Sequence, residues 1–260
     1  MKNLKTILLS LMCIMVFACG CGHKQQKDDL SIIKSRGRLI VGVKTDAKPF
    51  GFYNANHQLQ GYDIDLARAI ANAMFGSPNC VRFIPVTTSN RILKLEDEEV
   101  DMLISTMSVT NKRRQVLDFS RPYYISGQAM MVRKGSSIRN LQDLDGKHVI
   151  VVFGSTGEDN VTTHVPSAII YGYRTYSEAW NAFKSGKGDA FLADDIILKS
   201  YVESNGSFKL LPERYSKEPY AVAFRKTDES LRLQADVNIV ISDLQKTGRL
   251  SKMRHRWGLK

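Results

Sequence analysis

The sequence predicts an α/β protein built from two similar-sized units that face one another across a cleft. Short apolar, strand-like runs alternate with helix-like segments from Leu39 onward, which is typical of mainly parallel sheets covered by helices. A second series of the same kind begins near Ser137. Polar residues follow the strand-like runs in both series, and open α/β sheets bind ligands at the carboxyl ends of their strands. We therefore expect a small-molecule site between the two units.

The first series is expected to contain strands at residues 39–43, 81–86 and 100–104, and helices near residues 62–75 and 91–97. The longer helix begins near Gly61, where Asp63 can cap it, and Gly76 to Pro78 ends it. The second series has strands at 148–153 and 189–193, a turn at 154–157 that leads into a helix, an amphipathic segment at 177–185 and a final helix at 228–247.

Composition restricts the function. The chain has 260 residues and a net charge of +11, but its densest basic runs, 112–114 and 254–256, are short and no nucleic-acid-binding motif accompanies them. Nucleic acid is therefore not expected as a partner. The sequence contains no metal-ligand cluster, phosphate loop or nucleophile elbow, so neither a metal nor another cofactor is expected.

The amino terminus resembles an export signal. Lys2 and Lys5 precede an apolar run at 7–18 that is too short to span a bilayer comfortably. Residues 16–19 resemble a bacterial lipobox, which would place a lipid on Cys19; Cys21 is the alternative, and a plain secretory signal is a third possibility. We expect residues 1–21 to be a lipoprotein signal peptide and residues 22–37 a tether, giving an extracytoplasmic, lipid-anchored monomer without a disulfide framework.

Residues 105–113, Ser-Thr-Met-Ser-Val-Thr-Asn-Lys-Arg, follow a strand-like run and close on an arginine. Arg113 is a rigid, permanently charged fork that matches a carboxylate in two hydrogen bonds. The hydroxyl groups of this segment can supply further donors. The segment thus predicts a receiver for a small carboxylate; a polar loop with a solvated arginine is the alternative.

Six segments in order resemble one known family: residues 61–67, 105–113, 118–124, 154–156, 189–194 and 217–220. With the lipoprotein-like start, they make the chain similar to the bacterial extracellular solute-binding proteins of family 3, the polar amino-acid receptors of ABC importers. The resemblance covers about residues 37–258. It implies a type II periplasmic-binding-protein-like fold with mixed sheets flanked by helices and two crossover strands as a hinge.

The family fold implies lobe one at residues 38–127 and 220–260, lobe two at 132–217, and crossovers near 128–131 and 218–221. By the same resemblance, Arg113 takes the ligand α-carboxylate with help from Ser108. Thr156 and the amides of the turn that includes Ser155 add donors from lobe two, where a helix start favours an anion. Asp194 accepts the ligand ammonium, with Asp195 as a competing candidate. Thr106 stands where glycine or alanine is frequent and is expected to narrow the cleft.

The remaining site residues concern the ligand side chain. The segments that end at Arg91 and Lys44 resemble those of the glutamate/aspartate-binding branch of the family. In that branch, positive charge lies where the acidic side chain of the ligand ends. Phe50 or Phe52 is expected to form an apolar wall, with a core position as the alternative. The expected ligand is therefore glutamate or aspartate, and glutamine is its nearest rival.

Closure of the lobes would satisfy both charges of an amino acid and exclude water. The resemblance implies a free amino acid as ligand and the permease and ATPase subunits as protein partners. The main rival is an enzyme similar to cyclohexadienyl dehydratases. It would need a general acid in the cleft, and the candidates are Glu158, Asp159 and His164. None has a triad-like companion, so the chain is not expected to be an enzyme.

Overall fold

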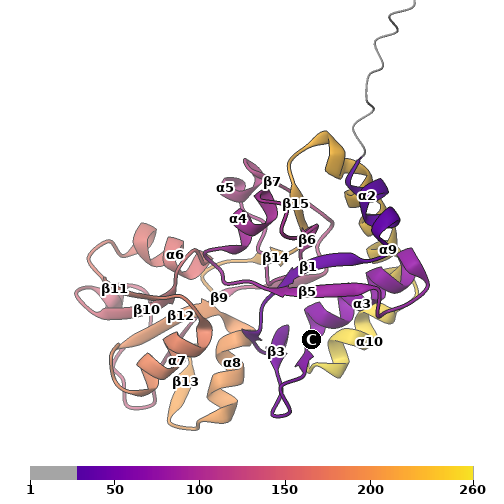
Figure 1. Ribbon diagram of the computed structural model, residues 1–260. Helices are drawn as coiled ribbons and strands as arrows, with labels where there is room; N and C mark the ends of the chain where they lie inside the picture. Colours follow the sequence, from indigo (N-terminus) through magenta and orange to yellow (C-terminus); the bar gives the residue numbers. More distant parts are fainter. Residues whose placement is uncertain (1–27, 260) are drawn as a thin grey trace, which may run out of the picture.

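The computed structural model describes residues 28–259 as two α/β lobes that lie side by side (Figure 1). The prediction of a lipoprotein signal, including lipidation of Cys19 or Cys21, falls outside these residues. Within the described range, no helix has both the length and the apolar character needed to cross a bilayer.

The first lobe contains a five-stranded sheet of order β5-β1-β6-β15-β7. Its strands are β1 (Leu39–Val43), β5 (Val81–Pro85), β6 (Met102–Leu103), β7 (Leu117–Phe119) and β15 (Ala223–Arg225). β5, β1 and β6 are parallel, whereas β15 is antiparallel to both of its neighbours. The helices of this lobe are α2 (Asp29–Arg36), α3 (Tyr62–Phe75), α4 (Arg91–Glu96), α5 (Asn111–Arg114), η2 (Asp228–Ser230), α9 (Leu231–Lys246) and α10 (Arg249–Arg256). The sheet is therefore mixed, as expected, because the chain returns to it after building the second lobe.

The second lobe repeats the plan with a five-stranded sheet of order β11-β10-β12-β9-β13. The strands are β9 (Gln128–Arg133), β10 (His148–Val152), β11 (Ile169–Tyr173), β12 (Ala190–Asp194) and β13 (Phe208–Leu210), and the helices are η1 (Gln142–Leu144), α6 (Thr156–His164), α7 (Tyr176–Lys184) and α8 (Asp195–Ser204). Every residue of β12 is buried, in keeping with a central strand that helices cover on both faces.

Two short strands, β8 (Tyr124–Ser126) and β14 (Glu218–Tyr220), connect the lobes and pair with each other in antiparallel register. The expected crossover near 218–221 therefore corresponds to β14. The expected crossover at 128–131 is wrong by several residues, because Gln128–Arg133 forms β9 of the second sheet, between β12 and β13. A small sheet of β2 (Asp46–Ala47), β3 (Gly51–Tyr53) and β4 (Leu59–Gln60) completes the first lobe.

Part of the expected tether at 22–37 is instead a folded helix, α2. Leu30 and Ile33 are buried against the first lobe. The Asp29 carboxylate binds Arg225 at 2.6 Å and accepts a hydrogen bond from the Ser230 hydroxyl at 2.6 Å. This anchoring corrects the tether prediction for the described part of that segment.

The start of α3 depends on glycine. Gly61 has φ +135°, and a Cβ at this position would lie 1.9 Å from the Phe50 carbonyl oxygen. Gly61 is also the N-cap, so the expectation that Asp63 caps this helix is wrong. Asp63 is buried and holds a neighbouring loop instead.

Gly61→Ala is expected to lower the free energy of unfolding by roughly 2–4 kcal/mol, because the new methyl group meets fixed backbone and the residue must keep a strained φ. Urea unfolding measures the effect. Gly135→Ala is the matched control, since a Cβ there has no neighbour within 4 Å among the described residues. Equal losses in the two variants would contradict the argument.

Candidate ligand-binding site

The carboxyl ends of β1, β6, β10 and β12 and the loops after them bring most of the predicted site residues together between the lobes. Buried polar residues gathered at this junction are Lys44, Arg91, Ser108, Arg113, Ser155, Thr156 and Asp194. Parallel strands place their carboxyl ends at one edge of a sheet, which is why residues far apart in the sequence meet here.

Arg113 spans the junction. Its side chain is buried, and Nη1 donates to the Ser108 carbonyl at 2.8 Å while Nη2 donates to the Gly154 carbonyl of the other lobe at 3.1 Å. Burial lowers the pKa of the guanidinium, and the nearby carboxylates of Glu218 and Asp194 oppose that shift. The alternative of a solvated loop arginine is therefore wrong.

Arg91 is a second buried guanidinium, with 2% of its surface exposed. Nη1 donates to the carbonyls of Ser105 at 2.6 Å and Thr106 at 3.3 Å. Burial and repulsion by Arg113 both lower its pKa. Among the described residues its Nε has no hydrogen-bond partner, so this group can still donate a hydrogen bond to an oxygen atom.

Lys44 is fully buried next to an acidic residue. Its Nζ lies 3.4 Å from Asp46 Oδ1, donates to the Thr88 hydroxyl at 3.1 Å and stands 5.1 Å from the centre of the Tyr176 ring. Asp46 also accepts the Tyr176 backbone N–H at 2.7 Å and so connects β2 to the start of α7 in the other lobe. The positive charge expected at this position is thus paired with a carboxylate.

Asp194 is the last residue of β12 and is buried in the site. It accepts a hydrogen bond from Gln128 Nε2 at 2.6 Å and from the Tyr176 hydroxyl at 3.3 Å. Burial and the charge of Glu218 raise the pKa of its carboxyl to about 7. The competing candidate, Asp195, pairs instead with Arg214 at 2.8 Å on a partly exposed surface.

The loop after β6 is held by a buried carboxylate. Asp63 accepts the Thr106 backbone N–H at 3.0 Å and the Tyr123 hydroxyl at 2.9 Å, and burial raises its pKa to about 7. Thr106 has φ +49°, which explains why a residue without a Cβ suits this position. Its hydroxyl donates to the Ser105 carbonyl at 2.7 Å, so Thr106 shapes the loop.

The predicted turn at 154–157 leads into a helix, α6, as expected. The Ser155 hydroxyl accepts the Glu158 backbone N–H at 3.2 Å as the N-cap, and Thr156 is the first helical residue. The Ser155 side chain is therefore used within the helix start, whereas the Thr156 hydroxyl faces other site residues.

Glu218 is a site residue whose role was not predicted from the sequence. Its carboxylate accepts hydrogen bonds from the hydroxyls of Ser108 at 2.5 Å, Thr156 at 2.7 Å and Ser216 at 2.8 Å. The sequence signal was its place in the segment 217–220, but partners 110 and 62 residues away along the chain are visible only in the fold.

The predicted aromatic wall does not form as a unit. Phe50 is fully buried and packs edge-on against Tyr124 and Tyr220, each with ring centres 5.2 Å apart, which is the core position left open by the sequence. Phe52 packs edge-on against Trp257, the residue after α10, with ring centres 5.8 Å apart. These contacts give no support to a ligand-binding role for Phe52.

The three candidate general acids lie outside the buried cluster. Glu158 accepts the Gly154 backbone N–H at 2.7 Å, Asp159 pairs with Lys112 at 3.5 Å, and His164 contacts the carbonyl of Asn160 at 2.9 Å. All three contacts are exposed or at the lobe surface. Glu158 and His164 make local hydrogen bonds near the two ends of α6, and Asp159 forms an exposed ion pair.

Several buried polar atoms of the site lack a hydrogen-bond partner within residues 28–259. They are Arg91 Nε, Ser105 Oγ, Gln128 Oε1 and the Tyr220 hydroxyl oxygen. A buried polar atom without a partner costs free energy, so a polar ligand that supplies partners would be favoured here.

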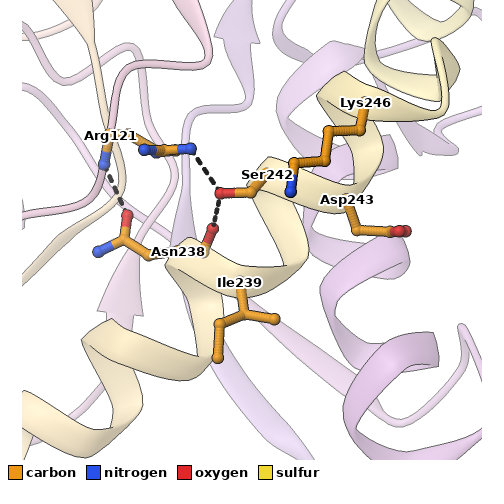
Figure 2. Close-up of a pocket in the computed structure, with 6 residues that line it drawn as sticks. All are labelled: Arg121, Asn238, Ile239, Ser242, Asp243 and Lys246. Atoms are coloured by element: carbon orange, nitrogen blue, oxygen red, sulfur yellow. Dashed lines mark hydrogen bonds between the residues drawn. The ribbon is translucent and has the colours of Figure 1, made fainter.

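A depression of about 650 Å³ opens beside the site, lined by residues of both lobes that include Thr88, Arg113 and Gly154. Another depression, of about 670 Å³, lies far from this chemistry. Figure 2 shows that it is formed largely by α9, with the Arg121 guanidinium donating to Ser242 and the Arg121 backbone N–H donating to Asn238. This depression contains none of the predicted site residues, so the buried cluster is the better candidate.

Comparisons with known proteins identify a matching family and similar proteins. The family model of bacterial extracellular solute-binding proteins, family 3, matches residues 39–260. The glutamine-binding protein GlnH of the ABC transporter of Bacillus subtilis is 31% identical over 268 residues, covering 99% of this chain and 97% of the relative. A glutamine-binding protein of Geobacillus stearothermophilus is 37% identical over 199 residues, covering 76% of each chain. A solved structure of an ancestral arginine-binding protein bound to glutamine has a TM-score of 0.80 at 37% identity and covers 85% of this chain and 98% of its own.

Proposed function

The chain belongs to the bacterial extracellular solute-binding proteins of family 3, and from this premise we propose that it captures a polar amino acid, with glutamine the best-supported ligand, between its two lobes. The family match and the relatives support the general role of substrate-binding protein of an ABC amino-acid transporter. The observation that carries the proposal is that a buried arginine, Arg113, lies on one lobe and a buried carboxylate, Asp194, lies on the other.

These two residues suit the two charges that every α-amino acid carries. Arg113 and the amides at the start of α6 are donors for the α-carboxylate, and Asp194 is an acceptor for the ammonium. Since the groups come from different lobes, an amino acid gains both contacts only when the lobes are together. The ligand would therefore stabilise the closed arrangement, which a transporter can recognise.

The environment of the ligand side chain favours a carboxamide. Lys44 and Asp46 lie together and offer a donor and an acceptor, and an amide group needs both. The three buried cations, Lys44, Arg91 and Arg113, lie among four carboxyl groups, those of Asp46, Asp63, Asp194 and Glu218, so the cluster has no excess of positive groups. A ligand with an uncharged side chain adds no further negative charge to this cluster. The glutamine-binding relatives support the same choice.

Glutamate or aspartate is the second candidate. The specific observation that favours it is the Nε of Arg91, which has no partner in the part of the chain that the structure describes, because a carboxylate oxygen would satisfy that donor. The lipid anchor and the monomeric state remain part of the proposal, as do the permease and ATPase partners. We propose no catalytic role.

Asp46→Asn is expected to weaken glutamine binding by about tenfold while changing glutamate binding little or improving it. The substitution removes the charged acceptor that suits an amide N–H and that repels a carboxylate. Isothermal titration calorimetry with both amino acids measures the selectivity. Asp65→Asn, on the outer side of α3 beside Trp257, is the control. A loss of glutamate affinity larger than that of glutamine would favour the acidic ligand.

A further inference from the structure

Glu218 lies where the two lobes and the hinge meet. It belongs to β14, one of the two strands that connect the lobes, and its side chain is 4% exposed. One oxygen, Oε2, accepts both the Ser108 hydroxyl, from the loop after β6, and the Thr156 hydroxyl, from the start of α6. The two hydroxyl partners of Oε2 therefore come from different lobes, and keeping both bonds requires the lobes to be in contact.

The carboxylate also fixes the direction of these hydrogen bonds. An ionised carboxylate only accepts, and a hydroxyl has a single proton to donate. The hydroxyls of Ser108 and Thr156 thus donate their hydrogen bonds to Glu218, and their lone pairs remain available to accept hydrogen bonds from other groups. Thr156 Oγ1 in fact accepts Gln128 Nε2 at 2.9 Å, and the same amide donates to Asp194.

The charge of Glu218 also connects it to Arg113 and Asp194. Glu218 is the largest of the carboxylate influences that oppose the lowered pKa of Arg113, and it contributes to the raised pKa of Asp194. Through Ser108 and Thr156 it is connected to the residues that we expect to hold both ends of an amino acid.

We propose that Glu218 is a positioning residue that couples lobe closure to ligand affinity by orienting the hydroxyls of Ser108 and Thr156. This inference rests on the proposed amino-acid-binding function. Glu218 acts through the two hydroxyls, so its effect on affinity depends on their presence.

The test compares Glu218→Gln with Glu213→Gln, an exposed residue on the segment that leads to β14. Calorimetry with L-glutamine, or with the amino acid that the wild-type protein binds best, is expected to show a loss of about tenfold or more for Glu218→Gln only. In the Ser108→Ala/Thr156→Val background, the same Glu218→Gln change is expected to have almost no further effect. Glu218→Asp, which keeps the charge but is one methylene shorter, is the second variant and should weaken binding in the same direction.

Two results would overturn the inference: wild-type affinity in Glu218→Gln, or an equal loss in the background without the hydroxyls. Small-angle X-ray scattering without amino acid gives an independent readout, because loss of both lobe contacts should increase the radius of gyration of Glu218→Gln relative to Glu213→Gln. Equal radii would also contradict it. Failure of the wild-type protein to bind any amino acid would contradict the proposed function, while the scattering comparison would still test the role of Glu218 in closure.

Discussion

Arg113→Ala is expected to weaken the binding of every amino acid strongly. The guanidinium is the buried cation whose fork connects the loop after β6 to the turn before α6, and the α-carboxylate that it would bind is common to all amino acids. Truncating one partner of a buried, hydrogen-bonded charge pair costs roughly 2–5 kcal/mol, which corresponds to about a 30- to 4,000-fold loss of affinity.

Calorimetry on the purified variant measures this loss. Arg114→Ala is the matched control, because Arg114 is the exposed neighbour on the same short helix. A melting temperature for Arg113→Ala close to that of the control would show that the variant is folded. Undiminished affinity in a folded Arg113→Ala protein would contradict the assignment of the carboxylate site.

Asp194→Asn is expected to weaken binding about as strongly, because an amide cannot supply the negative charge that an ammonium group needs. The substitution keeps the shape of the side chain, so the loss reports the charge. Asp195→Asn is the control and also tests the competing candidate, since Asp195 is already paired with Arg214. A larger loss in Asp195→Asn would reverse the assignment.

Asp194 also predicts a pH dependence. Its pKa is raised to about 7, mainly by burial, so the carboxyl is partly protonated near neutral pH. An ammonium ligand binds the ionised form, so affinity should rise as the pH increases from about 6 to 8 and binding should release protons. The free energy of unfolding depends on pH in the opposite direction. Because folding raises the pKa of this acid from 3.8 to about 7, its contribution to stability falls as the pH rises through about 7.

The pH profile of affinity, measured by calorimetry between pH 6 and 8, should be flatter in Asp194→Asn than in the wild-type protein. Asp63 has a similarly raised pKa and supports the loop at Thr106, so its contribution should remain in that variant. An unchanged slope in Asp194→Asn would show that another group controls the pH dependence.

The sequence was sufficient for the fold class because the apolar runs report burial directly. The run at residues 189–193 became the fully buried β12, and the run at 39–43 became β1. The predicted position of one hinge strand was wrong by several residues, because the local sequence does not determine which strands pair. Gln128–Arg133 reads as a crossover, but β12 and β13 are its hydrogen-bonded neighbours.

Helix α2 was missed for a similar reason. It is a short helix whose stabilising contacts, Asp29 with Arg225 and Ser230, join residues about 200 positions apart. The sequence before it is polar, so no local pattern distinguished a docked helix from a tether.

The cations of the candidate site and Asp194 were predicted from the sequence. The other carboxylates of the site, which lie near those cations, were not. Arg113 and Arg91 could be named because the resemblance supplied their positions. The pairing of Lys44 with Asp46, the burial of Asp63 and the hydrogen bonds of Glu218 depend on three-dimensional contacts. These contacts change the expectation for the ligand, because they reduce the positive charge that suggested an acidic amino acid.

The most direct test of the account is a thermal-shift panel of the twenty common amino acids on protein produced from residue 22. At a concentration 100 times the dissociation constant, a ligand adds roughly 2.7 kcal/mol of stability, which for a protein of this size corresponds to a rise in melting temperature of about 5–10 °C. We predict such a rise with glutamine, and a smaller rise or none with basic amino acids. A folded protein free of co-purified ligand that shows no rise with any amino acid would contradict the central claim.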